Sequence, residues 1–99
     1  MNIKISSVRF DADKKLLEFI EEKMKKLSGH YYNIVSSEVI LKLDNTSKDT
    51  NKVVEIRLII PGNELFSKKQ ATSFEEATDM SIDALKRQLS RYKSKIRGR

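Results

Sequence analysis

The chain has 99 residues, which is enough for one compact domain and too few for a two-domain enzyme. It has no cysteine and a single histidine, His30. Disulfides, cysteine–zinc sites and thiol catalysis are therefore excluded, and little remains for an imidazole metal site or a histidine-based triad. The longest apolar run, residues 58–60, is far too short to span a bilayer, and residues 1–4 lack the apolar stretch of a signal peptide. We expect a cytoplasmic single-domain protein that is not an enzyme and holds no metal or cofactor.

Positive charge is concentrated at one end of the chain. The net charge is +6, but residues 1–83 hold thirteen Lys or Arg and fourteen Asp or Glu, whereas residues 84–99 hold seven bases and no acid. Such a concentration on one element is typical of a surface that binds a polyanion, above all nucleic acid. Two other interpretations stay open: bases that only complement a helix dipole or form a solvated tail, and a surface for an anionic membrane.

The first third of the chain predicts a strand followed by a helix. Apolar and polar residues alternate at the start of residues 2–10, which indicates an edge or half-buried strand. Asp13 is a suitable N-cap for a helix over residues 14–28, and Gly29 is a natural residue to end it. The apolar residues of this helix recur three or four apart and so share one face: Leu16, Leu17, Ile20, Met24 and Leu27.

Three strands are expected in the middle of the chain. Apolar residues alternate with polar ones in residues 38–44 and again in residues 54–60. The wholly polar residues 45–51 between them form a loop. Residues 61–63, Pro-Gly-Asn, are a strong turn signal, and they predict a hairpin with a more polar, exposed strand over residues 65–71.

A second, longer helix begins after these strands. Ser73 and Glu76 form a capping box, in which Ser73 is the N-cap. A stripe of residues at helical spacing predicts the buried face, and it consists of Phe74, Thr78, Ile82, Leu85, Leu89, Tyr92 and Ile96.

The predicted order of elements is β-α-β-β-β-α. Two helices packed on one face of a four-stranded, mainly antiparallel sheet make an α+β two-layer sandwich. The first strand–helix–strand unit should supply one parallel or mixed pairing. Helix–three strands–helix is also the order in double-stranded-RNA-binding domains, an analogy of architecture that is weak support for a function.

Two rows of bases flank the apolar stripe of the second helix. One row follows i, i+4, i+8 spacing and consists of Arg87, Arg91 and Lys95. The opposite row consists of Lys86, Lys93 and Arg97. Bases about 6 Å apart along a helix resemble the spacing of phosphates along a strand, and an arginine can hold a phosphate through two hydrogen bonds. In the first helix, Lys23 and Lys26 lie off the apolar face and would extend this basic surface if the two helices lie side by side.

The second helix resembles a known family. Residues 85–95, Leu-Lys-Arg-Gln-Leu-Ser-Arg-Tyr-Lys-Ser-Lys, resemble the final helix of the ribosome hibernation-promoting factor family, also called ribosomal subunit interface proteins or sigma-54 modulation proteins. In that family the helix typically has an acid followed by R-Q-L, then a base, then an aromatic residue or His, and finally K-x-K. Asp79 and Asp83 fit its acidic positions. Residues 19–27 resemble the family's first helix with its K-x-x-K-L ending. The resemblance covers essentially the whole chain.

The resemblance implies a protein that binds the small ribosomal subunit of a bacterium, in the channel that messenger and transfer RNA occupy. Its basic helix surface would contact ribosomal RNA and reversibly block translation in idle ribosomes. We expect that the protein binds neither a membrane nor a small-molecule substrate. The RNA-binding residues expected are the positions that match the family together with the flanking Lys86 and Arg97, namely Lys23, Lys26, Lys86, Arg87, Arg91, Lys93, Lys95 and Arg97.

The resemblance also bears on domain organisation. Residues 1–99 would form a single ribosome-binding domain of the family's short form, without the C-terminal domain through which longer members pair ribosomes. Any pairing of ribosomes would then need a separate small partner protein.

Other functions stay open at this stage. The first is a general duplex-RNA-binding or RNA-chaperone module. An enzyme is a weaker alternative, since Asp79 and Asp83 at i, i+4 spacing could hold a hard cation, but no nucleophile–base set accompanies them. A regulator that binds only protein is a further alternative. His30, Tyr31 and Tyr32 could stack on RNA bases, or the tyrosines could cover the edge of the core.

Overall fold

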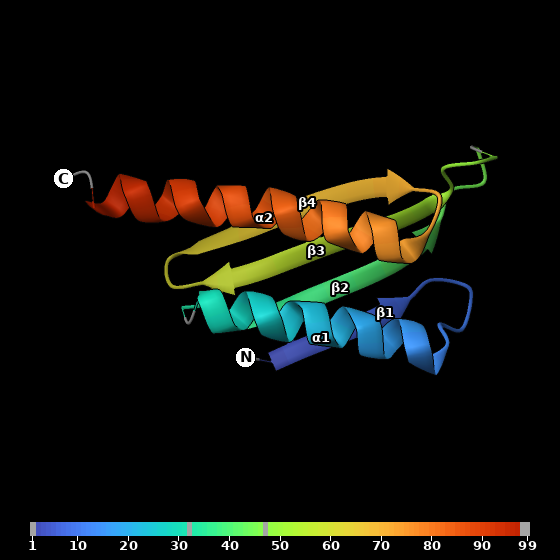
Figure 1. The fold of residues 1–99 in the computed structure, drawn as a ribbon, viewed down its shortest axis with the longest axis horizontal. Coiled ribbons are helices and arrows are strands. Elements are labelled where there is room, and N and C mark those ends of the chain that lie inside the picture. The colour runs from blue at the N-terminus through green and yellow to red at the C-terminus, as the bar shows by residue number, and fades with distance from the viewer. Residues whose placement is uncertain (1, 32, 47, 98–99) are drawn as a thin grey trace.

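The computed structural model describes residues 2–31, 33–46 and 48–97, with side chains described up to Tyr92. Four strands and two helices follow one another in the order expected from the sequence (Figure 1). Their bounds are β1 Asn2–Ser7, α1 Lys14–His30, β2 Ser36–Leu43, β3 Lys52–Ile60, β4 Asn63–Ala71 and α2 Phe74–Arg97.

The strands form one mixed sheet in the order β1-β2-β3-β4. β1 lies at one edge and pairs with β2 in parallel, from Asn2 opposite Ser36 onward. β2 with β3 and β3 with β4 are antiparallel. The sequence predictions of an edge strand and of one parallel pairing are therefore confirmed. A parallel pair needs a crossover connection, and α1 supplies it.

One face of the sheet carries the core. β3 alternates strictly over its second half, so that Ile56, Leu58 and Ile60 are buried while Arg57 between them is exposed. Each Ile or Leu side chain removed fully from water contributes about 1.5–3 kcal/mol. α1 adds four buried residues at helical spacing, Leu16, Ile20, Met24 and Leu27. The stripe expected on α2 is confirmed through five buried residues, Phe74, Thr78, Ile82, Leu85 and Leu89.

Both helices cover this same face of the sheet, as Figure 1 shows. α1 packs against β1, α2 packs against β3 and β4, and the two helices contact each other. They run in the same direction, and the C-terminal turns of α2 extend past the turn between β3 and β4 (Figure 1). The α+β two-layer sandwich with both helices on one face is therefore confirmed. No helix in the described part of the chain is long and apolar enough to cross a membrane.

The first strand is shorter than the sequence predicts. It ends at Ser7 instead of Phe10, because Arg9 takes a left-handed backbone conformation with φ of 64° that no strand accommodates. The hydroxyl of Ser7 donates a hydrogen bond of 2.6 Å to the carbonyl of Phe10 and closes this turn. The turn carries the ring of Phe10 onto the ring of Phe74, with the ring centroids 5.2 Å apart. The loop therefore contributes an aromatic side chain to the core.

The end of α1 also differs from the prediction. The helix continues through Gly29 to His30, and Gly29 has no left-handed φ, so its expected role as the terminating residue is wrong. The backbone N–H of Tyr31 still donates to the carbonyl of Leu27 at 3.1 Å. The side chain of Tyr31 packs against the core. This packing supports two more helical residues than the glycine alone would favour.

Both helix N-caps are confirmed. The carboxylate of Asp13 accepts a hydrogen bond of 2.8 Å from the backbone N–H of Leu16, and the hydroxyl of Ser73 accepts one of 3.1 Å from the N–H of Glu76. The carboxylate of Glu76 accepts a hydrogen bond from the hydroxyl of Thr72 at 3.1 Å. The bonds to Asp13 and Ser73 satisfy N–H groups that no helical carbonyl can reach.

The two connections in the sheet also follow the prediction. The hairpin between β3 and β4 turns at Gly62, whose φ of 75° suits a glycine. Hydrogen bonds at the polar β2–β3 loop lower the pKa of the Asp44 carboxyl below its usual value. The donors are the hydroxyl of Thr46 at 2.6 Å, the N–H of Thr46 at 2.9 Å and the amide of Gln70 at 2.8 Å.

Candidate nucleic-acid interface

The second half of α2 is anchored by polar side chains that alternate with its bases. The amide of Gln88 donates a hydrogen bond of 2.9 Å to the carbonyl of Phe66 on the edge strand β4. The hydroxyl of Tyr92 donates to the carbonyl of Pro61 at 3.2 Å. The hydroxyl of Ser90 lies 3.5 Å from that of Tyr31, the residue directly after α1. These contacts fix the rotation of the helix about its axis. That rotation decides which way its bases point.

The described bases of this half-helix are exposed and form no ion pair with a described acid. Lys86, Arg87 and Arg91 are all exposed. Among the described residues, none of the three forms an ion pair. A ligand can therefore reach their charge without breaking an ion pair. A guanidinium that has no intramolecular partner is well suited to hold a phosphate through two hydrogen bonds.

The lysines of α1 are in a different environment. The Nζ of Lys23 lies 3.3 Å from Oδ1 of Asp79 on α2 and 5.4 Å from the centre of the Phe19 ring. The Nζ of Lys26 lies 3.8 Å from a carboxylate oxygen of Glu22 on its own helix. Both lysines expected to face RNA therefore have a carboxylate beside them. They reach a phosphate only by leaving that contact or sharing it.

A groove of about 370 Å³ runs between the two helices. Lys23, Lys26 and Lys86 all line it, as expected from the sequence if the helices lie side by side. Arg87 and Arg91 do not line it and lie elsewhere on the exposed surface of α2. The full lining of the groove is Lys23, Lys26, Leu27, His30, Asp79, Ile82, Asp83 and Lys86. The structure thus divides the described bases into a groove set and an outer pair.

Three of the expected RNA-binding residues lie beyond the described side chains. The backbone of α2 is helical through Lys93, Lys95 and Arg97, on the turns that extend past the sheet. Nothing further is described of these side chains, nor of Ile96, the last residue of the expected stripe, nor of Tyr32. Of the aromatic residues considered for stacking, Tyr31 is half-buried and packs against the core, so it covers the core edge.

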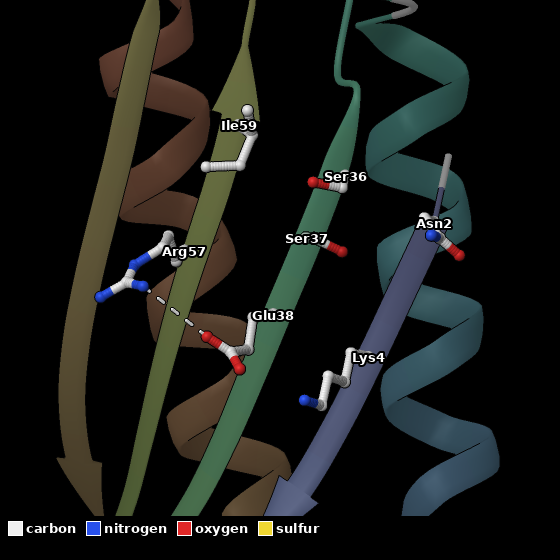
Figure 2. A pocket seen from close by; sticks show the side chains of 7 residues that line it. All are labelled: Asn2, Lys4, Ser36, Ser37, Glu38, Arg57 and Ile59. Carbon is white, nitrogen blue, oxygen red and sulfur yellow. Dashed lines mark ion pairs between the residues drawn. The ribbon is translucent and has the colours of Figure 1, made fainter.

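The face of the sheet away from the helices has balanced charge. A hollow of about 530 Å³ lies there. Figure 2 shows Lys4 on β1, Glu38 on β2 and Arg57 on β3 around it. Arg57 lies between two carboxylates, 3.8 Å from Glu38 and 2.6 Å from Glu64. Because acids neutralise the bases here, this face does not have the character of a polyanion site, and the candidate interface is the helix face.

The sequence does not predict that an acid of the groove lies beside Lys23. Asp79 and Asp83 were noted as positions typical of the helix and as a conceivable cation pair. Among the described residues, no three His, Asp or Glu side chains gather in a way that could hold a metal ion. The contact of Asp79 with Lys23 depends on the packing of two helices far apart in sequence. No local signal predicts it.

Known proteins resemble this chain over nearly its whole length. The model of the family described as Sigma 54 modulation protein / S30EA ribosomal protein matches residues 3–97. A ribosome hibernation promoting factor of Pseudomonas putida is 28% identical over 95 residues, covering 96% of this chain and 89% of that protein. Another ribosome hibernation promoting factor, from Salmonella typhimurium, is 27% identical over 97 residues, covering 98% of each chain.

A solved structure shares the fold. The ribosomal subunit interface protein from Coxiella burnetii superposes with a TM-score of 0.85 at 22% identity, over 95% of this chain and 99% of that one. At this identity the likeness supports the fold alone.

Proposed function

The chain belongs to the Sigma 54 modulation protein / S30EA ribosomal protein family, and from that premise we propose that it is a ribosome-associated hibernation factor. It acts in the cytoplasm on the small ribosomal subunit. It occupies the channel for messenger and transfer RNA and reversibly blocks translation in idle ribosomes. This proposal needs no enzymatic step, metal or cofactor.

The single observation that carries the proposal is the set of described bases on α2 that form no ion pair. Lys86, Arg87 and Arg91 are exposed without an ion pair among the described residues, on a helix held by Gln88 and Tyr92. Because the helix that carries them is already held in place, phosphate binding does not require ordering of the backbone. These bases also give up no ion pair when they bind. The surface is therefore prepared for ribosomal RNA before any contact forms.

The proposed mechanism is occlusion. The helix face binds ribosomal RNA through Lys23, Lys26, Lys86, Arg87 and Arg91, and we assign Lys93, Lys95 and Arg97 to the same surface. The body of the domain then fills space that messenger and transfer RNA would otherwise use. Because the contacts are ionic and non-covalent, the block is reversible and weakens as salt rises.

The second candidate function, a general duplex-RNA-binding module, has the fold in its favour. Both helices lie on one face of the sheet with bases on the outer side of α2, as shape-driven binding to an A-form helix requires. The two functions differ in which RNA the protein prefers. A hibernation factor prefers intact small subunits to naked duplex RNA of equal mass, and a duplex-binding module does not.

Co-sedimentation with purified bacterial small subunits through a sucrose gradient tests the proposal. The wild type should sediment stoichiometrically and resist displacement by naked duplex RNA. An Arg87→Glu/Arg91→Glu variant should stay at the top of the gradient. A matched control is Lys4→Glu/Lys68→Glu, which makes the same change of charge at two exposed lysines on the opposite face of the sheet and should sediment like the wild type. Displacement of the wild type by an equal mass of duplex would favour the second function.

A further inference from the structure

Two carboxylates stand in the groove where the proposed function needs positive charge. Asp79 and Asp83 lie one turn apart on α2, and both line the groove together with Lys23, Lys26 and Lys86. The wall that α1 contributes to the groove holds bases and Leu27 but no acid. A surface used only for attraction to a polyanion would gain from neutral residues at these two positions.

The charge of the groove changes along its length. The helices run in the same direction, so Lys23 lies beside Asp79 at one end (Figure 1). At the other end the groove is lined by His30 and Lys86, and the outer bases of α2 follow. One end of the groove is therefore close to neutral and the other is basic.

The ion pair at the neutral end does not exist chiefly for stability. The side chain of Lys23 is 36% exposed and that of Asp79 is 53% exposed, and ion pairs this exposed contribute little to folding. Asp83 forms no ion pair among the described residues and is exposed. Both carboxylates therefore remain accessible to an approaching RNA.

We propose, building on the proposed function, that Asp79 and Asp83 determine specificity by excluding regular duplex RNA from the groove. A strand of an A-form helix presents phosphates at short, even intervals, so a strand that follows the groove places phosphates beside both carboxylates. Like charges at such distances repel, and unfavourable contacts with the wrong partner are an established route to specificity. The folded RNA of the small subunit is not confined to this even spacing, so it can supply phosphates to the bases of the groove without placing one beside each carboxylate.

The test compares binding to two RNAs in the same buffer. The dissociation constants of wild type and Asp79→Asn/Asp83→Asn are measured for purified small subunits and for naked A-form duplex RNA. We expect the variant to bind duplex RNA about tenfold more tightly than the wild type does. Its affinity for subunits should rise by less than about threefold, so that the preference for subunits falls. Circular dichroism and thermal unfolding confirm that the variant is folded.

Two further variants separate repulsion from a general gain of charge. Glu18→Gln/Asp49→Asn removes two exposed acids outside the groove and should raise both affinities by similar factors. Asp83→Asn alone frees no lysine, so a gain in duplex affinity with this variant reports repulsion by the carboxylate and not the release of Lys23.

The outcomes also separate this inference from the function on which it rests. If the wild type binds subunits and the groove variant leaves the preference unchanged, or changes it no more than the control does, the specificity role is overturned and the hibernation function stands. If the wild type does not bind subunits, the proposed function fails, and the specificity role fails with it.

Discussion

The two groove lysines of α1 lie beside carboxylates, whereas the two outer arginines of α2 form no ion pair among the described residues. Lys23 lies beside Asp79 and Lys26 beside Glu22, whereas Arg87 and Arg91 have no acid partner among the described residues. At α1 a phosphate must displace a carboxylate from the lysine that it binds. At the two arginines of α2 it displaces only water. Equal numbers of bases can therefore contribute unequally to affinity.

The largest effect should come from reversing the charges of α2. Arg87→Glu/Arg91→Glu should weaken subunit binding at least about a hundredfold, because two phosphate contacts become two repulsions. Lys23→Glu/Lys26→Glu, with the same change of charge on α1, should weaken it only about tenfold. Equilibrium binding of labelled protein to small subunits measures both. Equal losses for the two variants would remove the distinction between the helices.

A smaller effect is expected within the groove itself. Lys86 and Lys23 line the same groove, but only Lys23 has a carboxylate partner. Lys86→Gln should weaken subunit binding about threefold, and Lys23→Gln should weaken it less than about twofold. The same binding assay at fixed salt shows which of the two variants loses more affinity. A larger loss for Lys23→Gln would mean that Lys23 leaves Asp79 completely in the complex.

The helix caps separate stability from binding. Asp13→Ala on α1 and Ser73→Ala on α2 each remove one capping hydrogen bond and should lower the free energy of unfolding by about 1 kcal/mol. Asp13→Asn and Ser73→Asp keep a capping oxygen and should retain most of that stability. Urea unfolding followed by circular dichroism measures all four variants. Subunit affinity should stay within about twofold of wild type, because no phosphate-binding base is changed.

The smallest effect should come from an anchor of α2. Tyr92→Phe removes the hydrogen bond to the carbonyl of Pro61 and leaves the ring in place. Because this bond is exposed, we expect a loss of about 0.5 kcal/mol in the free energy of unfolding. Hydrogen exchange should show faster exchange in the last turns of α2 and no change in α1. Unchanged exchange in α2 would show that the helix holds its position without this anchor.

The fold could be predicted from the sequence because it depends on periodicity. Alternation in β2 and β3 and helical spacing in α2 identify the core face without knowledge of the partners. The errors fell where tertiary contacts override local preference. Gly29 favours a helix end, but packing of Tyr31 against the core prolongs α1. The strand expected through Phe10 is cut short because the Phe10 ring turns inward onto Phe74.

The candidate site was predictable in composition and not in arrangement. The bases of α2 are visible in the sequence as a charge asymmetry, and their positions follow from the helical repeat. The pairing of Lys23 with Asp79 cannot be predicted from the sequence, because it joins residues on two helices and depends on how those helices pack. The division of the described bases into a groove set and the outer pair Arg87 and Arg91 likewise needs the packed structure.

The salt dependence of subunit binding tests the central claim most directly. The slope of log K against log salt is measured for wild type, for Arg87→Gln/Arg91→Gln and for Lys23→Gln/Lys26→Gln. Each base that neutralises a phosphate contributes about one unit. We expect the arginine variant to lower the slope by about two units and the lysine variant by less than about one. Equal reductions, or a slope near zero for the wild type, would contradict the claim that unpaired bases on α2 bind ribosomal RNA.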